Sequence, residues 1–506
     1  MKNKFPILVV CAGLLAGAAA CNKDAHENKD RSLTAGLLAA VPCPTGSPVG
    51  TVTLSGVITS NRTLSNDTIY QLSGLVYVTT PTGSASPTVL TIEAGTTIRG
   101  LAGTTGVPGG GLVITRGAQI NAEGNPTCPI VFTSYRQPQG TAQSGDWAGV
   151  IILGGATINT ATASGPTTAR VEGIPDNAPA SADYGGSNDQ DNSGILKYVR
   201  IEYAGFALSA NNEINGLTLA GVGCGTTIDF VEVYKSNDDA FEFFGGTVNA
   251  KHLIAVDALD DMFDTDNGFR GSVQYALGLS DTTRADFSQS NGIESDNNSA
   301  GNTNTPQTRP VFSNLTIIGL PNAAKANSTT MPPTGTGLYG RGAHVRRNSA
   351  YVMQNSIILG FSRGVELDGT ASQANYTSAL SCFNNNLFHA YTSTAAAFAG
   401  ANPATALTTP TGTTLFTGTN WSAIRLKSPF VRTADGSDGF FMPVFNAVPA
   451  QNSPALSGVG TGCLSVFCSA TTPAFTFDTP AFRGAFGRSD VAANNWATGW
   501  SKFSGQ

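Results

Sequence analysis

The sequence predicts an all-β protein that folds as a right-handed parallel β-helix, with about 22 residues per rung, loop insertions and a C-terminal cap. Three observations favour this fold. Glycine is abundant, at 59 of 506 residues, and only 12 % of the residues are charged. Short apolar segments also recur 22 residues apart. A typical soluble domain carries roughly twice this charged fraction, so the composition argues against a disordered acidic chain and against a coiled coil.

The 22-residue repeat occurs in two places. Residues 90–98 align with residues 112–120, and residues 230–246 align with residues 252–268. Apolar residues alternate within each copy and glycine recurs inside it, so a helix cannot continue through the pattern. Leucine-rich repeats share the period but need a leucine ladder that this chain lacks, and an array of β-sandwiches does not explain the repeat. Rungs stacked about 4.8 Å apart do explain it.

Four regions follow one another along the chain. They are a lipoprotein signal peptide over 1–20, an acylated cysteine and flexible tether over 21–48, the β-helix over 49–470 and a C-terminal cap over 471–506. Polar stretches at 160–194, 322–338 and 396–418 are expected to leave the solenoid as loops. The last segment is aromatic and non-repetitive, which is typical of a cap over the open edge strands of a solenoid.

The first 21 residues have the features of an export signal. Two lysines precede an apolar run over residues 5–16, and small residues follow at 17–20. Cys21 comes next and resembles the acylated cysteine of a bacterial lipoprotein, although Ala18 stands where leucine is usual. The alternative is an ordinary signal peptide that is cut near Ala20.

The most charged ten residues of the chain, 22–31, follow Cys21 directly. They resemble the tether that directs lipoproteins of Bacteroidota to the outer cell surface, and the alternative is a solvated linker. No later segment reaches about 18 uninterrupted apolar residues. We therefore expect a protein that is anchored to the outer membrane through the lipid at Cys21 and faces the cell surface.

Six cysteines remain once Cys11 is removed with the signal and Cys21 is acylated. An even number in an exported chain predicts up to three disulfides, with 15 possible connectivities. A short loop separates Cys463 from Cys468, which favours a disulfide between these two. The pairing of the other four stays open: Cys43, Cys128, Cys224 and Cys382.

Eight of the 34 acidic residues fall within residues 238–266. At the 22-residue offset Asp238 stacks on Asp260, and their neighbours follow in register. Like charges on neighbouring strands repel, and a divalent cation relieves that repulsion. Ca²⁺ takes six to eight oxygen ligands in tolerant geometry, and no histidine or cysteine cluster is present to favour zinc. The expected Ca²⁺ ligands are Asp238, Asp239, Glu242, Asp260, Asp261, Asp264 and Asp266.

Two alternatives remain for this acidic cluster. In one, the carboxylates occupy exposed rung corners, solvated by water or paired with Lys235, Lys251 and Arg270. In the other, two of them form a catalytic pair. The architecture resembles that of pectate lyases and polygalacturonase-type hydrolases. Lyases of this kind use an acidic Ca²⁺ cluster and a basic residue, for which Arg270 or Lys235 is the candidate here. Hydrolases of this kind need Gly-His-Gly and Arg-Ile-Lys motifs, and neither motif occurs in the chain.

Residues 235–251, with Asp260-Asp261 and residues 268–271, resemble an uncharacterised family of bacterial cell-envelope lipoproteins with a pectin-lyase-like β-helix. The resemblance covers most of residues 50–506 and implies fold and location, but no activity. The net charge of −6 indicates no binding of nucleic acid. We therefore expect a non-catalytic role, stabilised by Ca²⁺: the protein binds a glycan or another envelope component, or it serves as an accessory to an outer-membrane receptor. The alternatives are a Ca²⁺-dependent polysaccharide lyase and a structural envelope protein.

Overall fold

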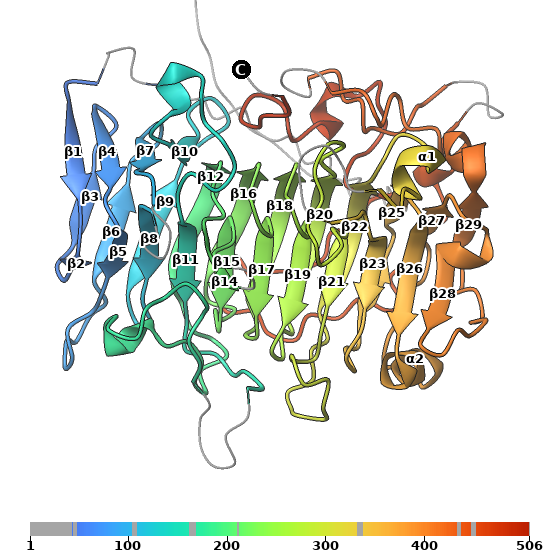
Figure 1. The fold of residues 1–506 in the computed structure, drawn as a ribbon, viewed down its shortest axis with the longest axis horizontal. Coiled ribbons are helices and arrows are strands. Elements are labelled where there is room, and N and C mark those ends of the chain that lie inside the picture. The colour runs from blue at the N-terminus through green and yellow to red at the C-terminus, as the bar shows by residue number, and fades with distance from the viewer. Residues whose placement is uncertain are drawn as a thin grey trace, which may run out of the picture. The chain divides into compact units, whose positions relative to one another are not determined.

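The computed structural model describes residues 43, 48–103, 109–160, 168–209, 212–330, 337–432, 437–446 and 452–504. From the first strand to residue 417 this part of the chain is a solenoid of stacked parallel strands (Figure 1). The predicted right-handed parallel β-helix is confirmed. The signal peptide, Cys21 and the charged tether lie outside the described residues. No helix in the described ranges is both long and apolar enough to cross a membrane.

One long sheet, sheet A, supplies two of the three faces of the solenoid. Its strands are β1 (Gly50–Leu54), β3 (Arg62–Leu64), β4 (Thr68–Leu72), β6 (Val89–Ile92), β7 (Thr97–Gly100), β9 (Gln119–Glu123), β10 (Ile130–Ser134), β12 (Gly194–Glu202), β16 (Thr227–Tyr234), β18 (Asn249–Val256), β20 (Ser272–Leu279), β22 (Val311–Ile318), β24 (Val352–Gln354), β25 (Ile357–Phe361), β27 (Leu387–Ala390) and β29 (Thr414–Thr417). The long strands from β12 to β22 cross the corner between the two faces.

The third face is sheet B, which carries the site described below. Its strands are β2 (Val57–Ile58), β5 (Leu75–Val78), β8 (Gly111–Ile114), β11 (Gly149–Leu153), β15 (Leu217–Ala220), β17 (Phe241–Phe244), β19 (Phe263–Asp266), β21 (Ile293–Ser295), β23 (Arg341–Val345), β26 (Arg363–Asp368) and β28 (Phe398–Ala401). A short antiparallel hairpin joins β13 (Ala207–Ser209) to β14 (Asn212–Glu213). The helices are α1 (Ala323–Ala326), α2 (Thr370–Thr377) and short 3₁₀ turns at η1 (Gln137–Gln139), η2 (Ala180–Ala182), η3 (Ala395–Ala397), η4 (Gly418–Ile424), η6 (Pro454–Leu456) and η7 (Ala492–Asn494).

The corner inside sheet A is built by one residue per rung in the left-handed backbone region. Tyr198, Phe230, His252 and Tyr275 have φ between 50° and 62°, and strand pairing omits them. Their rings therefore point outward and stack on one another, with centroids 4.1 Å apart for Phe230 and His252. This outward aromatic ladder needs a cover, because it lies outside the core.

The rung length is not constant. Phe241 pairs with Phe263 across the predicted offset of 22, but Val199 pairs with Val231, 32 residues later. Leu90 pairs with residue 120 and not with residue 112, so the predicted repeat at 90–120 is wrong. Loops of different length separate the strands, and the offset of 22 holds only where those loops are shortest. Of the three segments predicted to leave the solenoid as loops, the last, residues 396–418, is only partly a loop. It contains the solenoid strands β28 and β29.

The core lies inside the solenoid and is formed by inward residues in register. Replacing Leu253, which is fully buried, with alanine is expected to lower the free energy of unfolding by about 3 kcal/mol, because a cavity is left in close-packed surroundings. The matched control is Leu380→Ala, since 36 % of Leu380 is exposed, and a loss under about 1 kcal/mol is expected there. Urea unfolding measures both, and equal losses would contradict the inward placement of Leu253.

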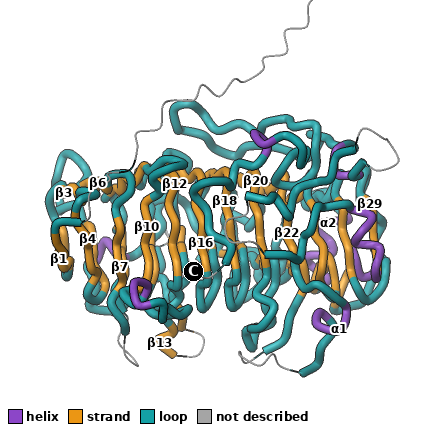
Figure 2. Tube along the Cα trace, turned by 90° about the horizontal axis from the view of Figure 1, so that it is seen from above, coloured by secondary structure: helices purple, strands orange, loops and turns teal. Residues whose placement is uncertain are grey.

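The described part of the segment after β29 returns along the side of the solenoid. Asn314 donates a hydrogen bond to the carbonyl oxygen of Phe482 (2.9 Å), and Arg200 donates one to that of Trp500 (2.9 Å). The Trp500 ring packs edge-on against Tyr198 and Phe230. Figure 2 shows the C-terminus beside the middle of sheet A. The expected end cap over 471–506 is thus a lateral cover of the aromatic ladder, and strand pairing stops well before the predicted boundary at 470.

The predicted disulfide between Cys463 and Cys468 is wrong. Cys463 pairs with Cys382, and Cys468 pairs with Cys224. The third disulfide joins Cys43 to Cys128. Cys463 and Cys468 belong to the returning segment. Because this segment passes over the rungs, each of the two meets a cysteine of the solenoid. These two disulfides fasten the returning segment to the rungs beneath it, just before the lateral cover begins.

Candidate metal centre

The polar groups of interest lie on the outer face of sheet B, where five neighbouring strands stack in register. Side chains alternate between the two faces of a strand, so Phe241 and Phe263 point into the core while Glu242 and Asp264 point outward. Polar residues in register form three ladders: one just before these strands or at their first residues, one along the strands from β17 to β26, and one at their ends from β19 onward. The first is Asp239, Asp261, Asn291, Arg341 and Arg363, the second is Glu242, Asp264, Glu294, His344 and Glu366, and the third is Asp266, Asp296, Arg346 and Asp368.

Side-chain to backbone hydrogen bonds hold the first ladder in place. Oδ1 of Asp239 accepts from the backbone N–H of Asp261 (2.8 Å), and Oδ1 of Asp261 accepts from that of Asn291 (2.6 Å). Oδ1 of Asn291 then accepts from the N–H of Arg341 (2.8 Å). One oxygen of each aspartate is thereby fixed along the solenoid axis.

Seven carboxylates at the β17 and β19 rungs form what we call the carboxylate array. They are Asp238, Asp239, Glu242, Asp260, Asp261, Asp264 and Asp266, the residues predicted to bind Ca²⁺. Oxygens of Asp238, Asp239 and Asp260 lie within 4.8 Å of one another, and so do those of Asp239, Glu242 and Asp264. Asp239 belongs to both groups and is only 7 % exposed. The geometry therefore supplies two adjoining sets of three carboxylates.

None of these seven carboxylates forms an ion pair with a described residue. The three cations considered as partners lie elsewhere. Lys251 pairs with Asp478 (2.8 Å) and Arg270 pairs with Asp189 (3.3 Å), while Lys235 lies over the ring of Tyr234. The predicted pairing of these carboxylates with Lys235, Lys251 and Arg270 is therefore wrong. The proposed lyase bases Arg270 and Lys235 are both engaged away from the array.

The array is electrostatically strained without a cation. Burial raises the pKa of all seven carboxyl groups, and neighbouring carboxylates raise it further. For Asp260 and Asp266 the pKa rises to about 7. Near neutral pH the array therefore holds protons in the absence of a cation, because it cannot hold every negative charge.

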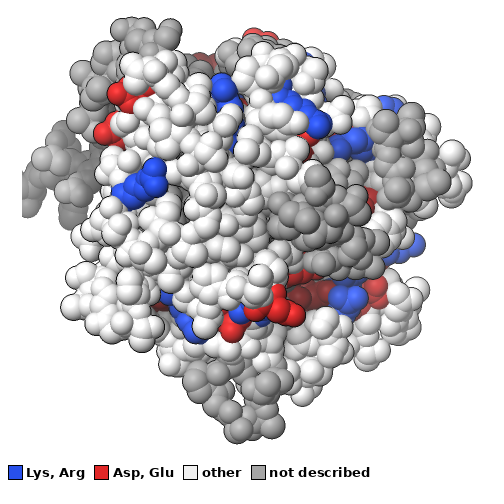
Figure 3. Space-filling view, turned by 60° about the vertical axis from the view of Figure 1, so that its left-hand side comes forward, with Lys and Arg blue, Asp and Glu red and all other residues white. Residues whose placement is uncertain are grey.

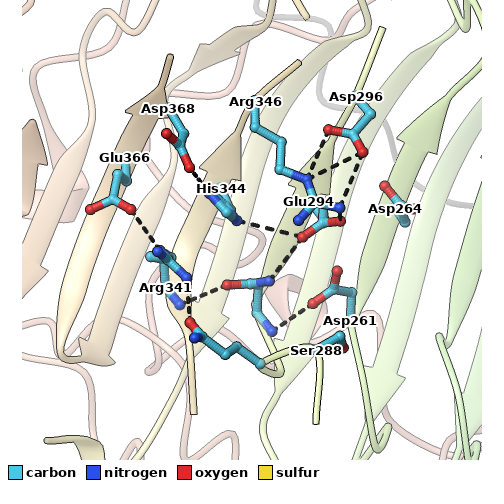
Figure 4. A network of polar contacts seen from close by, with 12 residues as sticks. Asp261, Asp264, Ser288, Glu294, Asp296, Arg341, His344, Arg346, Glu366 and Asp368 are labelled. Atoms are coloured by element: carbon cyan, nitrogen blue, oxygen red, sulfur yellow. Dashed lines mark hydrogen bonds and ion pairs between the residues drawn. The ribbon is translucent and has the colours of Figure 1, made fainter. Parts of the chain in front are cut away.

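The later rungs carry their own cations, which the sequence analysis did not assign. Arg346 bonds to both Glu294 and Asp296, and Nε2 of His344 lies 3.0 Å from Asp368 (Figure 4). Burial lowers the pKa of His344, but its hydrogen bonds to Asp368 and Glu294 outweigh burial and raise it. The carboxylates of these rungs are thus neutralised by the protein, whereas those of the array are not.

The insertion between β11 and β12 borders the array on the other side. Val171, Ile174 and Tyr184 of this insertion pack on apolar outward residues of the earlier strands of sheet B. The ring of Tyr184 meets Phe244 at 6.0 Å, and burial followed by the charge of Asp266 raises its pKa. Figure 3 shows acidic side chains in a recess with basic side chains beside them. The array therefore lies between this insertion, whose Glu172 adds to the negative charge around Asp238 and Glu242, and the cationic rungs.

A family model described as a pectate-lyase-like β-helix domain matches residues 56–423 of the chain. The match runs from the first strands of the solenoid to its last, and it includes the carboxylate array. No curated protein and no solved structure matches the chain.

Proposed function

The chain belongs to the pectate-lyase-like β-helix domain family, and from this premise we propose that it is a Ca²⁺-stabilised, non-catalytic protein of the cell envelope that binds a glycan or another envelope component. One observation carries the proposal. Seven carboxylates stand together at the β17 and β19 rungs, none of them forms an ion pair with a described residue, and their pKa values are raised.

Ca²⁺ suits this donor set better than other common cations. It prefers carboxylate and carbonyl oxygens and tolerates irregular geometry, whereas zinc favours nitrogen and sulfur ligands. Asp238, Asp239 and Asp260 are the ligands proposed for one ion, and Glu242 and Asp264 join Asp239 at a second position. Bound Ca²⁺ supplies the positive charge that removes the repulsion between the β17 and β19 rungs.

The proposed location rests on the N-terminal signal and on the disulfides. Three disulfides join the described cysteines, and disulfides persist mainly in exported proteins. We propose that the lipid at Cys21 anchors the protein in the outer membrane and that the charged tether places the solenoid at the cell surface. A glycan or an outer-membrane receptor is then within reach.

A binding role is favoured over catalysis because the cations near the array are occupied. Arg341, His344 and Arg346 each contact a carboxylate of the later rungs, so none of these three side chains is a free base beside the array. The family description favours a second candidate, a Ca²⁺-dependent polysaccharide lyase. Incubation with acidic polysaccharides and Ca²⁺, followed by ultraviolet absorbance of unsaturated products, separates the two. Steady product formation would overturn the non-catalytic role.

Calorimetric titration of the full chain with Ca²⁺ tests the metal. Saturable binding is expected for the wild type, and binding at least roughly tenfold weaker is expected for Asp264→Asn and Asp261→Ala, which corresponds to about 1.4 kcal/mol. Glu123→Gln is the control, because this carboxylate is 55 % exposed and pairs with Lys197 on sheet A. The absence of Ca²⁺ binding by the wild type would refute the metal centre.

A further inference from the structure

Two arginines stand at the N-terminal ends of two neighbouring strands of sheet B. Arg341 is the first residue of β23 and Arg363 the first of β26, and they pair in register, one rung or about 4.8 Å apart. Both guanidinium groups contact Glu366. Nε of Arg341 donates to its Oε1 at 2.7 Å, and Nη1 of Arg363 donates to its Oε2. Because Glu366 is only 1 % exposed, it acts as a buried anchor that orients both arginines.

The N-terminal ends of β23 and β26 carry more positive than negative charge. Glu366 supplies one negative charge for two guanidinium groups, and like charges in register on neighbouring strands repel. The other arginines of this face differ, since Arg346 and Arg347 meet Glu294 and Asp296. Among the described residues, the guanidinium groups of Arg341 and Arg363 therefore carry one more positive charge than Glu366 neutralises.

A cavity of about 270 Å³ opens beside the two arginines. Its described walls hold no carboxylate and include Gln289, Asn327, Ser328, Arg341, Ser362 and Arg363. Half of the Arg363 side chain is exposed, so its donors are accessible to a ligand. The lining offers amide and hydroxyl groups around an excess of positive charge, which is typical of a site for an anion.

The unused donors indicate the shape of the anion. A guanidinium has five N–H groups. Arg341 uses Nε on Glu366 and Nη1 on Gln289, and Arg363 uses Nη1, so Nη2 of both and Nε of Arg363 have no partner among the described residues. A planar carboxylate pairs in the plane of one guanidinium. A tetrahedral anion directs its oxygens out of one plane and so meets donors from two rungs. We propose that Arg341 and Arg363 bind a tetrahedral oxyanion, a sulfate or phosphate group.

The surroundings leave room for a larger molecule that carries this group. A second cavity of about 620 Å³ also has Arg363 in its wall. Hydroxyl groups of Thr392 and Thr394 line it together with the apolar side chains of Phe398 and Leu415. A sugar bearing a sulfate or phosphate ester fits this combination of an anion pocket and an adjoining hydroxyl and apolar surface. The inference goes beyond the proposed function, because it uses none of the residues of the carboxylate array.

The experiment titrates the full chain with sodium sulfate and with sodium phosphate at constant ionic strength, in the presence of EDTA, and measures heat. Saturable binding is expected for at least one anion. Arg363→Gln is expected to bind at least tenfold more weakly, while Arg341 still satisfies Glu366 and keeps the variant folded. Arg488→Gln is the matched control, because Arg488 is 43 % exposed and pairs with Asp490, and wild-type affinity is expected for it.

Two results would overturn the site: no saturable binding of either anion to the wild type, or equal affinity for wild type and Arg363→Gln. A sulfated oligosaccharide and its desulfated counterpart form the second arm. If the sulfated oligosaccharide binds more tightly than inorganic sulfate and the desulfated one does not bind, the oxyanion belongs to a glycan. If inorganic sulfate binds as tightly as the sulfated oligosaccharide, the ligand is the free ion. Ca²⁺ titration of Arg363→Gln is expected to match the wild type, so failure here is distinguishable from failure of the metal centre.

Discussion

Replacing Cys224 and Cys468 together with alanine is expected to lower the free energy of unfolding by about 5 kcal/mol in the loop-entropy model of disulfides. This disulfide spans 244 residues and joins a fully buried turn of the solenoid to the returning C-terminal segment. The variant loses the constraint on the unfolded chain, and residues 464–480 lose their covalent attachment to the turn before β16. We therefore also expect faster proteolytic cleavage within this segment.

Chemical denaturation under non-reducing conditions, with limited proteolysis in parallel, checks this expectation. Denaturation of the wild type with and without a reducing agent is the first control, because reduction acts on all three disulfides. The second is Cys43→Ala/Cys128→Ala, which removes a loop of 85 residues at the other end of the solenoid and is expected to leave the C-terminal segment protected. An unchanged midpoint in Cys224→Ala/Cys468→Ala would show that the side-chain contacts alone hold the cover.

The lateral cover was not predictable from the repeat because its contacts connect residues far apart in sequence. Lys502 donates its backbone N–H to both oxygens of Glu232, and its Nζ lies 3.3 Å from Glu202. These acids look like solvent-exposed positions in a strand pattern. The outward aromatic ladder at Phe230 and His252 was the available signal, since stacked rings at an outer corner require a cover.

The offset of 22 residues predicted part of the fold for a clear physical reason. Between β16 and β19 the turns are short, so Phe241 meets Phe263 and Glu242 meets Asp264 as the offset predicts. The next rung is reached only after a longer loop, and Asp264 meets Glu294 there. A constant period therefore describes the solenoid only in the region where the acidic residues recur.

The same limit applies to the candidate site. The carboxylate array was predictable because its members lie on two rungs of the regular repeat. Arg346 lies some 50 residues after Asp296, beyond an insertion that contains α1, so no periodicity connects the two. The sequence signal for these cations was only the run of Arg341, His344, Arg346 and Arg347 along one strand and the turn after it.

Raising the pH from 5 to 8 in the presence of EDTA is expected to lower the free energy of unfolding by an amount on the order of several kcal/mol. The carboxyl groups of the array have folded pKa values above their unfolded values, about 7 for Asp260 and Asp266. The folded state therefore binds more protons than the unfolded state between about pH 4 and 7. Linkage then requires stability to fall as the pH rises through this window.

Saturating Ca²⁺ is expected to reverse this loss, because the ion binds the ionised array and its apparent affinity rises as protons leave. At a concentration one hundred times Kd, an ion that binds only the folded state contributes about 2.7 kcal/mol. The difference in unfolding free energy between Ca²⁺ and EDTA should thus grow from pH 5 to pH 8. Glu232 lies beneath the C-terminal segment, outside the array, and burial raises its pKa to about 8. Its contribution to the pH dependence of stability is therefore expected both with Ca²⁺ and with EDTA.

Urea unfolding at pH 5, 6, 7 and 8, with Ca²⁺ and with EDTA, measures these slopes. Asp260→Asn/Asp266→Asn is expected to flatten the EDTA slope, since both substitutions remove a titrating group and a repelling charge from the β19 rung. The control Glu123→Gln alters an exposed carboxylate outside the array and should keep the wild-type slope. A wild-type stability that rises with pH in EDTA, or a Ca²⁺ effect that shrinks with pH, would mean that the array is ionised and stable without a cation. The metal would then have no role in holding the β17 and β19 rungs together.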